Sequence, residues 1–288
     1  MVAIVPPWGS SIHAMSLITR LAFRSALVAP LVALATPVSA GVGDLLVAPT
    51  RIILNGGRGT EVILNNIGDD TATYRISVEV KRMRADGSFE DVAAPNAREA
   101  TARDMIVYAP RRVVLPPRQP QTIRIAARAP AGLADGEYRV HLLFRAVPAA
   151  QPPVATPADF KGIGFALTPV YGVTIPVIVR LGNLSAKAGI ANVGKIMLEG
   201  KPAIAMELSR SGSRSTYGEV RVLKAGMKEP LAIQRGIAVY TEVDSRTVTV
   251  PVSAELAAQA SGPVTVQYVE LSDGAPPAVL AETTAVLR

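Results

Sequence analysis

The sequence predicts an all-β protein with two sandwich domains in tandem, behind a cleaved signal peptide. Short runs of alternating apolar and polar residues recur along the chain, as expected for strands with one buried face. Turn signals rich in Gly, Pro and Asn separate these runs, and the chain has 23 glycines and 23 prolines. Helical periodicity is almost absent, and only the short segment Ala254–Ala260 has a helix-forming composition. The length of 288 residues suits two domains.

Residues 1–40 form the predicted signal peptide. They contain no acidic residue, and Arg20 and Arg24 precede an apolar run, Ser25–Ala35. The small residues before position 41 match a cleavage site, so we expect cleavage after Ala40. Residues 1–14 are unusual for such a segment, and Met15 is the expected true start. The alternative is an uncleaved anchor, although the apolar run is too short to span a membrane comfortably.

Composition argues against nucleic acid and membrane as stable partners. The formal net charge is +7, and it falls to +5 when the two signal-peptide arginines are removed. The basic residues are scattered and aromatic residues are few, so we expect no nucleic-acid partner. No segment after residue 40 has the length and apolarity of a membrane-spanning helix, so we expect no stable membrane insertion.

Residue types used in catalysis and metal binding are scarce. The absence of cysteine excludes disulfides, thiolate metal sites and cysteine nucleophiles. His141 is the one histidine after residue 40, so a Ser-His-Asp triad would have to use it. It lies in an alternating run, which favours a packed or surface strand histidine. Phosphate-loop, nucleophile-elbow and zinc-protease motifs are missing from the sequence. We therefore expect no metal, no cofactor and no enzymatic activity.

Residues 41–181 form the predicted first domain. Thr73–Met83 alternates most clearly, and Asp86-Gly87 after it predicts a hairpin turn. The strands expected before the last one are Leu45–Leu54, Thr60–Leu64, Thr73–Met83, Ile106–Tyr108, Val113–Leu115, Thr122–Ala126 and Tyr138–Val147.

The last strand of this domain is unusually long. Every second residue from Ile163 to Val179 is mostly apolar, which predicts a strand over residues 163–179, far beyond the usual length of about 5–6 residues. Such a strand can extend past its own sheet and present free backbone groups and an apolar face. The alternatives are a buried strand or two strands broken at Pro169. The proline-rich segment Pro148–Pro157 before it is either a domain linker or a long loop.

Residues 182–288 form the predicted second domain, a smaller sandwich. A segment rich in Gly, Ala and Asn around Leu181–Ala191 marks the expected joint between the domains. The expected strands are Lys195–Leu198, Ala203–Leu208, Gly218–Leu223, Gly236–Val243, Arg246–Val250, Val264–Leu271 and Ala278–Val286. We find no repeat of fixed period in the chain.

Several segments share their pattern with one family. They are APTRIIL, which contains Thr50 and Arg51, VILNNIGDD (Val62–Asp70), YAPRRVVLPPRQPQTIRI (Tyr108–Ile125), LADGEYRVHLLFRAVP (Leu133–Pro148) and SRSGSRSTYGEV (Ser209–Val220). Together they resemble the periplasmic pilus or fimbrial assembly chaperones, the PapD-like family, over most of residues 44–288. The fourth segment keeps the signature's spacing from Glu137 to Pro148. It departs at His141, where the signature has an aromatic residue, and at Leu143, where it has Asn.

The resemblance implies a boomerang of two Ig-like domains that works as a chaperone in the periplasm. Such a protein binds pilus or fimbrial subunits by donor-strand complementation and delivers them to an outer-membrane usher for assembly. The long strand of the chaperone pairs into a gap in the subunit's incomplete sandwich. Main-chain hydrogen bonds then give sequence-tolerant pairing, and alternating apolar side chains fill the subunit's groove.

The resemblance also implies the binding residues. Arg51 is expected to anchor the subunit's C-terminal carboxylate by a charge-assisted hydrogen bond. The family's second basic residue, a strand lysine, is missing, and Thr174 or Pro176 stands at the aligned position. The implied subunit-binding residues are Arg51, Ile163, Phe165, Leu167, Tyr171, Val173 and Thr174. An exposed donor strand also favours self-association of the free protein. The alternative function is a secreted two-domain Ig-like binding or adhesive module that is itself part of a surface structure.

Overall fold

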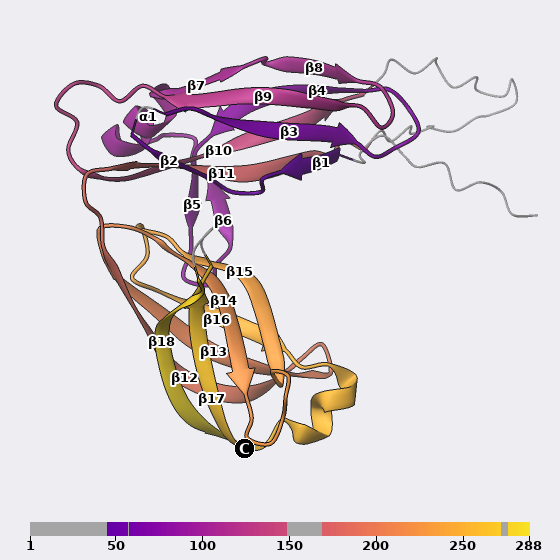
Figure 1. Cartoon of the computed structure of the whole chain (residues 1–288), viewed down its shortest axis with the longest axis vertical. Coiled ribbons are helices and arrows are strands. Elements are labelled where there is room, and N and C mark those ends of the chain that lie inside the picture. The colour runs from indigo at the N-terminus through magenta and orange to yellow at the C-terminus, as the bar shows by residue number, and fades with distance from the viewer. Residues whose placement is uncertain (1–44, 57, 149–168, 272–275) are drawn as a thin grey trace, which may run out of the picture. The chain divides into compact units, whose positions relative to one another are not determined.

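The computed structural model describes residues 45–56, 58–148, 169–271 and 276–288, and their regular secondary structure is almost entirely β-strand (Figure 1). The all-β prediction is therefore confirmed. All described residues belong to one compact unit. In this part of the chain no helix is long and apolar enough to cross a membrane. The predicted signal peptide, residues 1–40, lies outside the described residues and stays a prediction.

Nine of the strands up to residue 181 form two sheets, which we call the N-terminal sandwich. One sheet has the order β1 (Leu45–Ala48), β3 (Thr60–Asn66), β9 (Pro120–Ala127) and β7 (Ile106–Ala109). The other has the order β2 (Ile52–Asn55), β11 (Gly172–Leu181), β10 (Gly136–Val147), β4 (Ala72–Glu79) and β8 (Arg112–Leu115). The chain changes sheets between β1 and β2, so residues 49–51 form a crossover beside the edge of the second sheet.

Alternating side chains build the core between these two sheets. In β4, Tyr74 and Ile76 are buried while Arg75 between them is exposed, as the period of two predicts. The central strand β10 contributes Leu142 and Phe144, both fully buried. Burial of each such side chain contributes about 1.5–3 kcal/mol relative to exposure. The core therefore fixes which face of each strand points inward, and with it the strand register.

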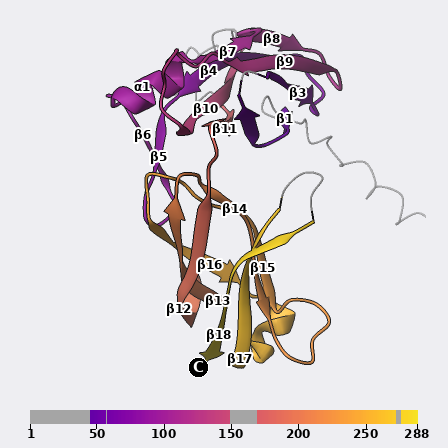
Figure 2. The same ribbon diagram turned by 60° about the vertical axis from the view of Figure 1, so that its left-hand side comes forward.

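Strands after residue 185 form a second sandwich with a core of its own, which we call the C-terminal sandwich. One sheet has the order β12 (Ala186–Leu198), β13 (Lys201–Gly212) and β16 (Ser245–Pro251). The other has the order β15 (Ala232–Val239), β14 (Thr216–Leu223), β17 (Gly262–Glu270) and β18 (Ala278–Leu287). Figure 2 shows β12, β13 and β16 on one side of this sandwich and β14, β15 and β17 on the other. Tyr268 is buried between them and donates its hydroxyl to the carbonyl oxygen of Ile237 at 2.9 Å.

One helix was not expected from the sequence. Helix α1 spans Ala97–Asp104 and begins with a capping box. The Asn96 side chain accepts the backbone N–H of Glu99 at 2.9 Å, and the Glu99 carboxylate accepts the backbone N–H of Asn96 at 2.8 Å. The pattern Asn-x-x-Glu was therefore the signal in the sequence. In the segment with helix-forming composition, a 3-10 helix, η1, spans Ala254–Gln259.

The alternating run Thr73–Met83 is divided between two sheets. Its first part is β4, and its last part, β5 (Lys81–Met83), pairs instead with β6 (Phe89–Asp91) as a two-stranded hairpin. Asp86-Gly87 closes this hairpin, as predicted. The φ of Gly87 is 83°, a left-handed conformation that glycine adopts without strain.

The long last strand begins later than its alternation predicts. Strand β11 starts at Gly172, and residues 169–171 lie outside it. For these three residues the prediction of a continuous strand from residue 163 is therefore wrong. The register of β11 with β10 explains the limit, because continuing it would place Pro169 opposite Pro148. Neither proline has an N–H, so neither can donate to the ladder. Residues 163–168 lie outside the described residues.

Candidate functional site

The crossover between β1 and β2 places Arg51 in a pocket of about 530 Å³. Thr50 and Arg51 line the pocket from the crossover, Arg180 from β11, and Tyr217 and Glu270 from the C-terminal sandwich. Glu270 is already paired, because its two carboxylate oxygens accept Nη1 and Nη2 of Arg214 at 2.6 and 3.1 Å. The acidic group of the pocket is therefore not available to neutralise Arg51.

The Arg51 guanidinium is held by neutral groups. Nη1 donates to the Tyr240 hydroxyl at 3.0 Å, and Nη2 donates to Ser215 Oγ at 3.4 Å. Cζ lies 4.4 Å from the ring centroid of Tyr217, within the range of a cation–π interaction. Nε is buried without a hydrogen-bond partner, and no ion pair of Arg51 forms among the described residues. A partly buried charge without a counter-ion favours binding of a carboxylate.

Arg180, which the sequence reasoning did not consider, is the second cation of this pocket. Its Nε donates to Glu137 Oε2 at 3.0 Å, and the backbone N–H of Ser215 donates to the same oxygen at 3.1 Å. Neither of the two positions aligned with the family's lysine lines this pocket. The β2–β11 register places Pro176 beside Arg51 when it is continued by one residue, and Thr174 is exposed and outside the pocket lining. Arg180 lies four residues after Pro176, on the same side of the strand.

Strand β11 has a free edge. On one side it pairs with β10 over Gly172–Leu181, but on the other side β2 covers only Val177–Arg180. The backbone N–H of Ala146 donates to the carbonyl of Tyr171. The N–H and C=O groups of every second residue after Tyr171, including Val173 and Ile175, therefore point toward β10. Gly172, Thr174 and Pro176 therefore direct their backbone groups away from β10. The ladder with β2 does not extend to Gly172 or Thr174, and no other strand among the described residues pairs with them on this side.

Proline at position 176 fits this geometry. Its missing N–H would lie on the outward side, so the ladder with β10 loses no hydrogen bond. The outward groups that β2 does not reach are therefore the N–H and C=O of Gly172 and Thr174. They stand next to the crossover that carries Arg51, because β2 begins directly after Arg51.

The proposed donor side chains are only partly described. Val173 is partly buried and packs against the core of the N-terminal sandwich, with the same parity as Ile175. Tyr171 precedes β11 and is 54% exposed. Ile163, Phe165 and Leu167, the first three residues expected to fill a subunit's groove, lie outside the described residues. In the sequence they continue the parity of Val173 and Ile175.

His141 is packed inside the molecule, which is one of the two strand environments that its alternating run allowed. It is buried on β10, its ring lies edge-on to Phe89 at a centroid distance of 5.3 Å, and Arg139 Nη1 lies 3.2 Å from Nε2. Burial above all, together with the positive charges of Arg139, Lys81 and Arg51, lowers the pKa of His141 to about 3. His141 is therefore neutral at physiological pH.

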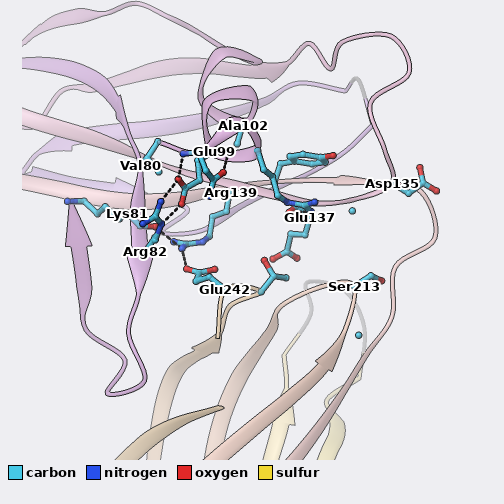
Figure 3. A pocket seen from close by; sticks show the side chains of 16 residues that line it. Val80, Lys81, Arg82, Glu99, Ala102, Asp135, Glu137, Arg139, Ser213 and Glu242 are labelled. Carbon is cyan, nitrogen blue, oxygen red and sulfur yellow. Dashed lines mark hydrogen bonds and ion pairs between the residues drawn. The ribbon is translucent and has the colours of Figure 1, made fainter. Parts of the chain in front are cut away.

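A second cavity, of about 510 Å³, contains paired charges (Figure 3). Nε and Nη2 of Arg82 donate to the two carboxylate oxygens of Glu99 at 2.5 and 2.7 Å. Arg139 Nη2 donates to Oε1 of Glu242, and the same oxygen accepts the backbone N–H of Met83 at 2.9 Å. The bonds to Glu242 connect β10 and the hairpin β5–β6 to the C-terminal sandwich, and the bonds to Glu99 connect this hairpin to α1. Within the described ranges no cluster of three His, Asp or Glu side chains is arranged to hold a metal ion.

Comparisons with known proteins find similar folds among solved chaperones. The E. coli chaperone DraB is 16% identical with a TM-score of 0.46, and the match covers 86% of this chain and 98% of that one. The SafB chaperone of Salmonella enterica, solved with the SafA pilin, is 15% identical with a TM-score of 0.43, over 86% of this chain and 98% of the other.

A third solved structure comes from Acinetobacter baumannii, the CsuC–CsuE chaperone–tip adhesion subunit pre-assembly complex. It is 12% identical with a TM-score of 0.41, over 84% of this chain and 97% of that one. No family model and no curated protein matches the sequence. These matches report a likeness in fold at low sequence identity.

Proposed function

We propose that this protein is a periplasmic chaperone that binds pilus or fimbrial subunits by donor-strand complementation and delivers them for outer-membrane assembly. The observation that carries the proposal is the free edge of β11 beside an arginine without a counter-ion. A strand of the subunit pairs with the outward backbone groups of Gly172 and Thr174. Main-chain pairing of this kind tolerates different subunit sequences.

Apolar side chains before β11 supply the second part of the interaction. Ile163, Phe165 and Leu167, followed by Tyr171 and Val173, fill the groove that the subunit's missing strand leaves open. Each large side chain that becomes buried contributes about 1.5–3 kcal/mol before the cost of ordering the segment is subtracted. Pro148–Pro157 then belongs to a loop of the first domain, which spans residues 41–181 ahead of the second, 182–288.

Arg51 anchors the subunit's C-terminal carboxylate in the pocket. Two of its five N–H groups are used by Tyr240 and Ser215, so the guanidinium retains donors for a ligand. Arg180 adds positive potential in the same pocket, although Glu137 offsets much of it. The missing strand lysine is therefore not replaced by Thr174, and the anchor depends mainly on Arg51.

The remaining assignments follow from this function. A signal peptide cleaved after Ala40 delivers the chain to the periplasm, where it works without catalysis and without a cofactor. An outer-membrane usher receives the chaperone–subunit complex. In the absence of a subunit, the apolar segment before β11 and the free edge favour self-association.

Two matched double variants test strand donation. The tagged protein is purified from the periplasm of cells that make it, and the copurified subunit is identified and its stoichiometry measured by mass spectrometry. Phe165→Asp with Leu167→Asp should abolish one-to-one capture. Ala166→Asp with Thr168→Asp adds the same charge at the alternate positions and should retain most capture. Equal capture by both double variants, with both folded by circular dichroism, would overturn the proposal.

A further inference from the structure

Two tyrosines of the C-terminal sandwich enclose the Arg51 guanidinium. Tyr217 on β14 lies under it, with its ring centroid 4.4 Å from Cζ. Tyr240, which directly follows β15, accepts Nη1 with its hydroxyl at 3.0 Å, and its ring centroid is 5.5 Å from Cζ. The orientation of an arginine on the N-terminal sandwich is therefore set by residues of the other sandwich.

Tyr240 is itself firmly held. It is 4% exposed and belongs to a small core with Met83, Ile178 and Ala238. Arg139 stacks on its ring with Cζ 3.9 Å from the centroid. Arg139 is fixed in turn by Glu242 and by the carbonyl oxygen of Lys81, the former drawn in Figure 3. The hydroxyl that receives Arg51 thus has a defined position.

This rigidity matters for carboxylate binding, because a free arginine side chain loses considerable rotamer entropy when it is ordered by a ligand. A guanidinium that is already ordered binds with less of this loss. The neutral partners also leave its charge intact, whereas an acidic partner would compete with the ligand.

We propose that Tyr240 and Tyr217 are positioning residues that fix the Arg51 guanidinium for carboxylate binding, an inference that rests on the proposed function of Arg51 as the anchor. Without the Tyr240 hydroxyl the ligand must order the Arg51 side chain itself, which corresponds to about a twofold to twelvefold loss of affinity. Loss of the Tyr217 ring removes the cation–π contact, which corresponds to about a twofold to fivefold loss.

Arginine side-chain NMR tests this directly. The Arg51 Nε and Nη signals of the whole protein are assigned by their loss in Arg51→Lys. In the wild type, hydrogen bonding to Tyr240 should slow rotation about Nε–Cζ and keep the two Nη signals separate. Tyr240→Phe should merge them, whereas the control Tyr108→Phe, whose hydroxyl donates to Ile76 O at 3.2 Å, should not.

Acetate and acetamide then serve as probes at Arg51. Acetate, but not acetamide, should shift the wild-type Arg51 signals, with weaker binding in Tyr240→Phe and in Tyr217→Leu. Merged Nη signals in the wild type, or equal acetate affinity in wild type and both variants, would overturn the positioning role while leaving Arg51 as an anchor. Separate Nη signals without any acetate response would instead overturn the anchor, and with it the positioning role for carboxylate binding.

Discussion

Replacing Thr174 with proline tests whether the free edge of β11 pairs with a strand of the subunit. The N–H of Thr174 points away from β10, so Thr174→Pro removes a donor from the free edge and leaves the ladder with β10 intact. Pro176 already occupies the next outward position, which shows that this edge accommodates proline. Val173→Pro is the matched control, because the N–H of Val173 faces β10 opposite Phe144.

We expect Thr174→Pro to weaken subunit binding with little change in stability, and Val173→Pro to lower stability. For Thr174→Pro we expect the free energy of unfolding to change by about 0.5 kcal/mol or less, as for a surface substitution. Loss of one hydrogen bond to the subunit, about 0.5–1.5 kcal/mol, should weaken subunit binding by about twofold to twelvefold. Val173→Pro leaves the buried carbonyl of Phe144 without its donor and should cost about 1–3 kcal/mol of stability.

Urea unfolding measures the first quantity, and the rate of subunit release from the purified complex measures the second. Similar destabilisation by both prolines would show that the assigned backbone parity of β11 is wrong. Unchanged subunit release from Thr174→Pro, with its stability also unchanged, would show that the free edge does not bind the subunit's strand.

Two further predictions concern stability. The pKa of His141 is lowered to about 3 in the folded protein from 6.5, so as the pH falls below about 6.5 the unfolded state takes up a proton before the folded state does. The stability that this group contributes is present above pH 6.5, and it should fall by about 2 kcal/mol from pH 7 to pH 5. The measurement is urea unfolding of the wild type and of His141→Phe across this pH range. Parallel pH profiles of the two proteins would refute the prediction. Asn96→Ala removes the cap of α1 and should cost about 0.5–2 kcal/mol, whereas exposed Asn183→Ala should cost less; equal losses in thermal unfolding would contradict the capping role.

Much of the fold could be predicted from the sequence because strands with one buried face leave a period of two in the chain. The alternation of Tyr74 and Ile76 with Arg75 is an example, and Asp86-Gly87 marked a hairpin by its turn chemistry. Helix α1 was missed because its face is largely polar and its cap, Asn96 with Glu99, is a short signal. The start of β11 was placed too early, since the alternation of side chains says nothing about where a partner strand stops supplying hydrogen bonds.

The candidate site could be predicted only in part. Arg51 was found through the segment around Thr50, but the residues that hold it were not. Tyr240 and Ser215 lie 189 and 164 positions away in the chain, and no local pattern connects such distant residues. Arg180 was passed over because its role depends on the register of β11 with β2 and on Glu137.

The sequence by itself determined the fold class and the apolar alternation before β11, because these depend on local periodicity, and the family resemblance of its segments pointed to Arg51. Only the tertiary structure decided which backbone groups of β11 are free and which groups surround Arg51. Both are consequences of strand pairing and of packing between residues far apart in the chain, since a hydrogen-bond ladder covers an edge only as far as its partner extends.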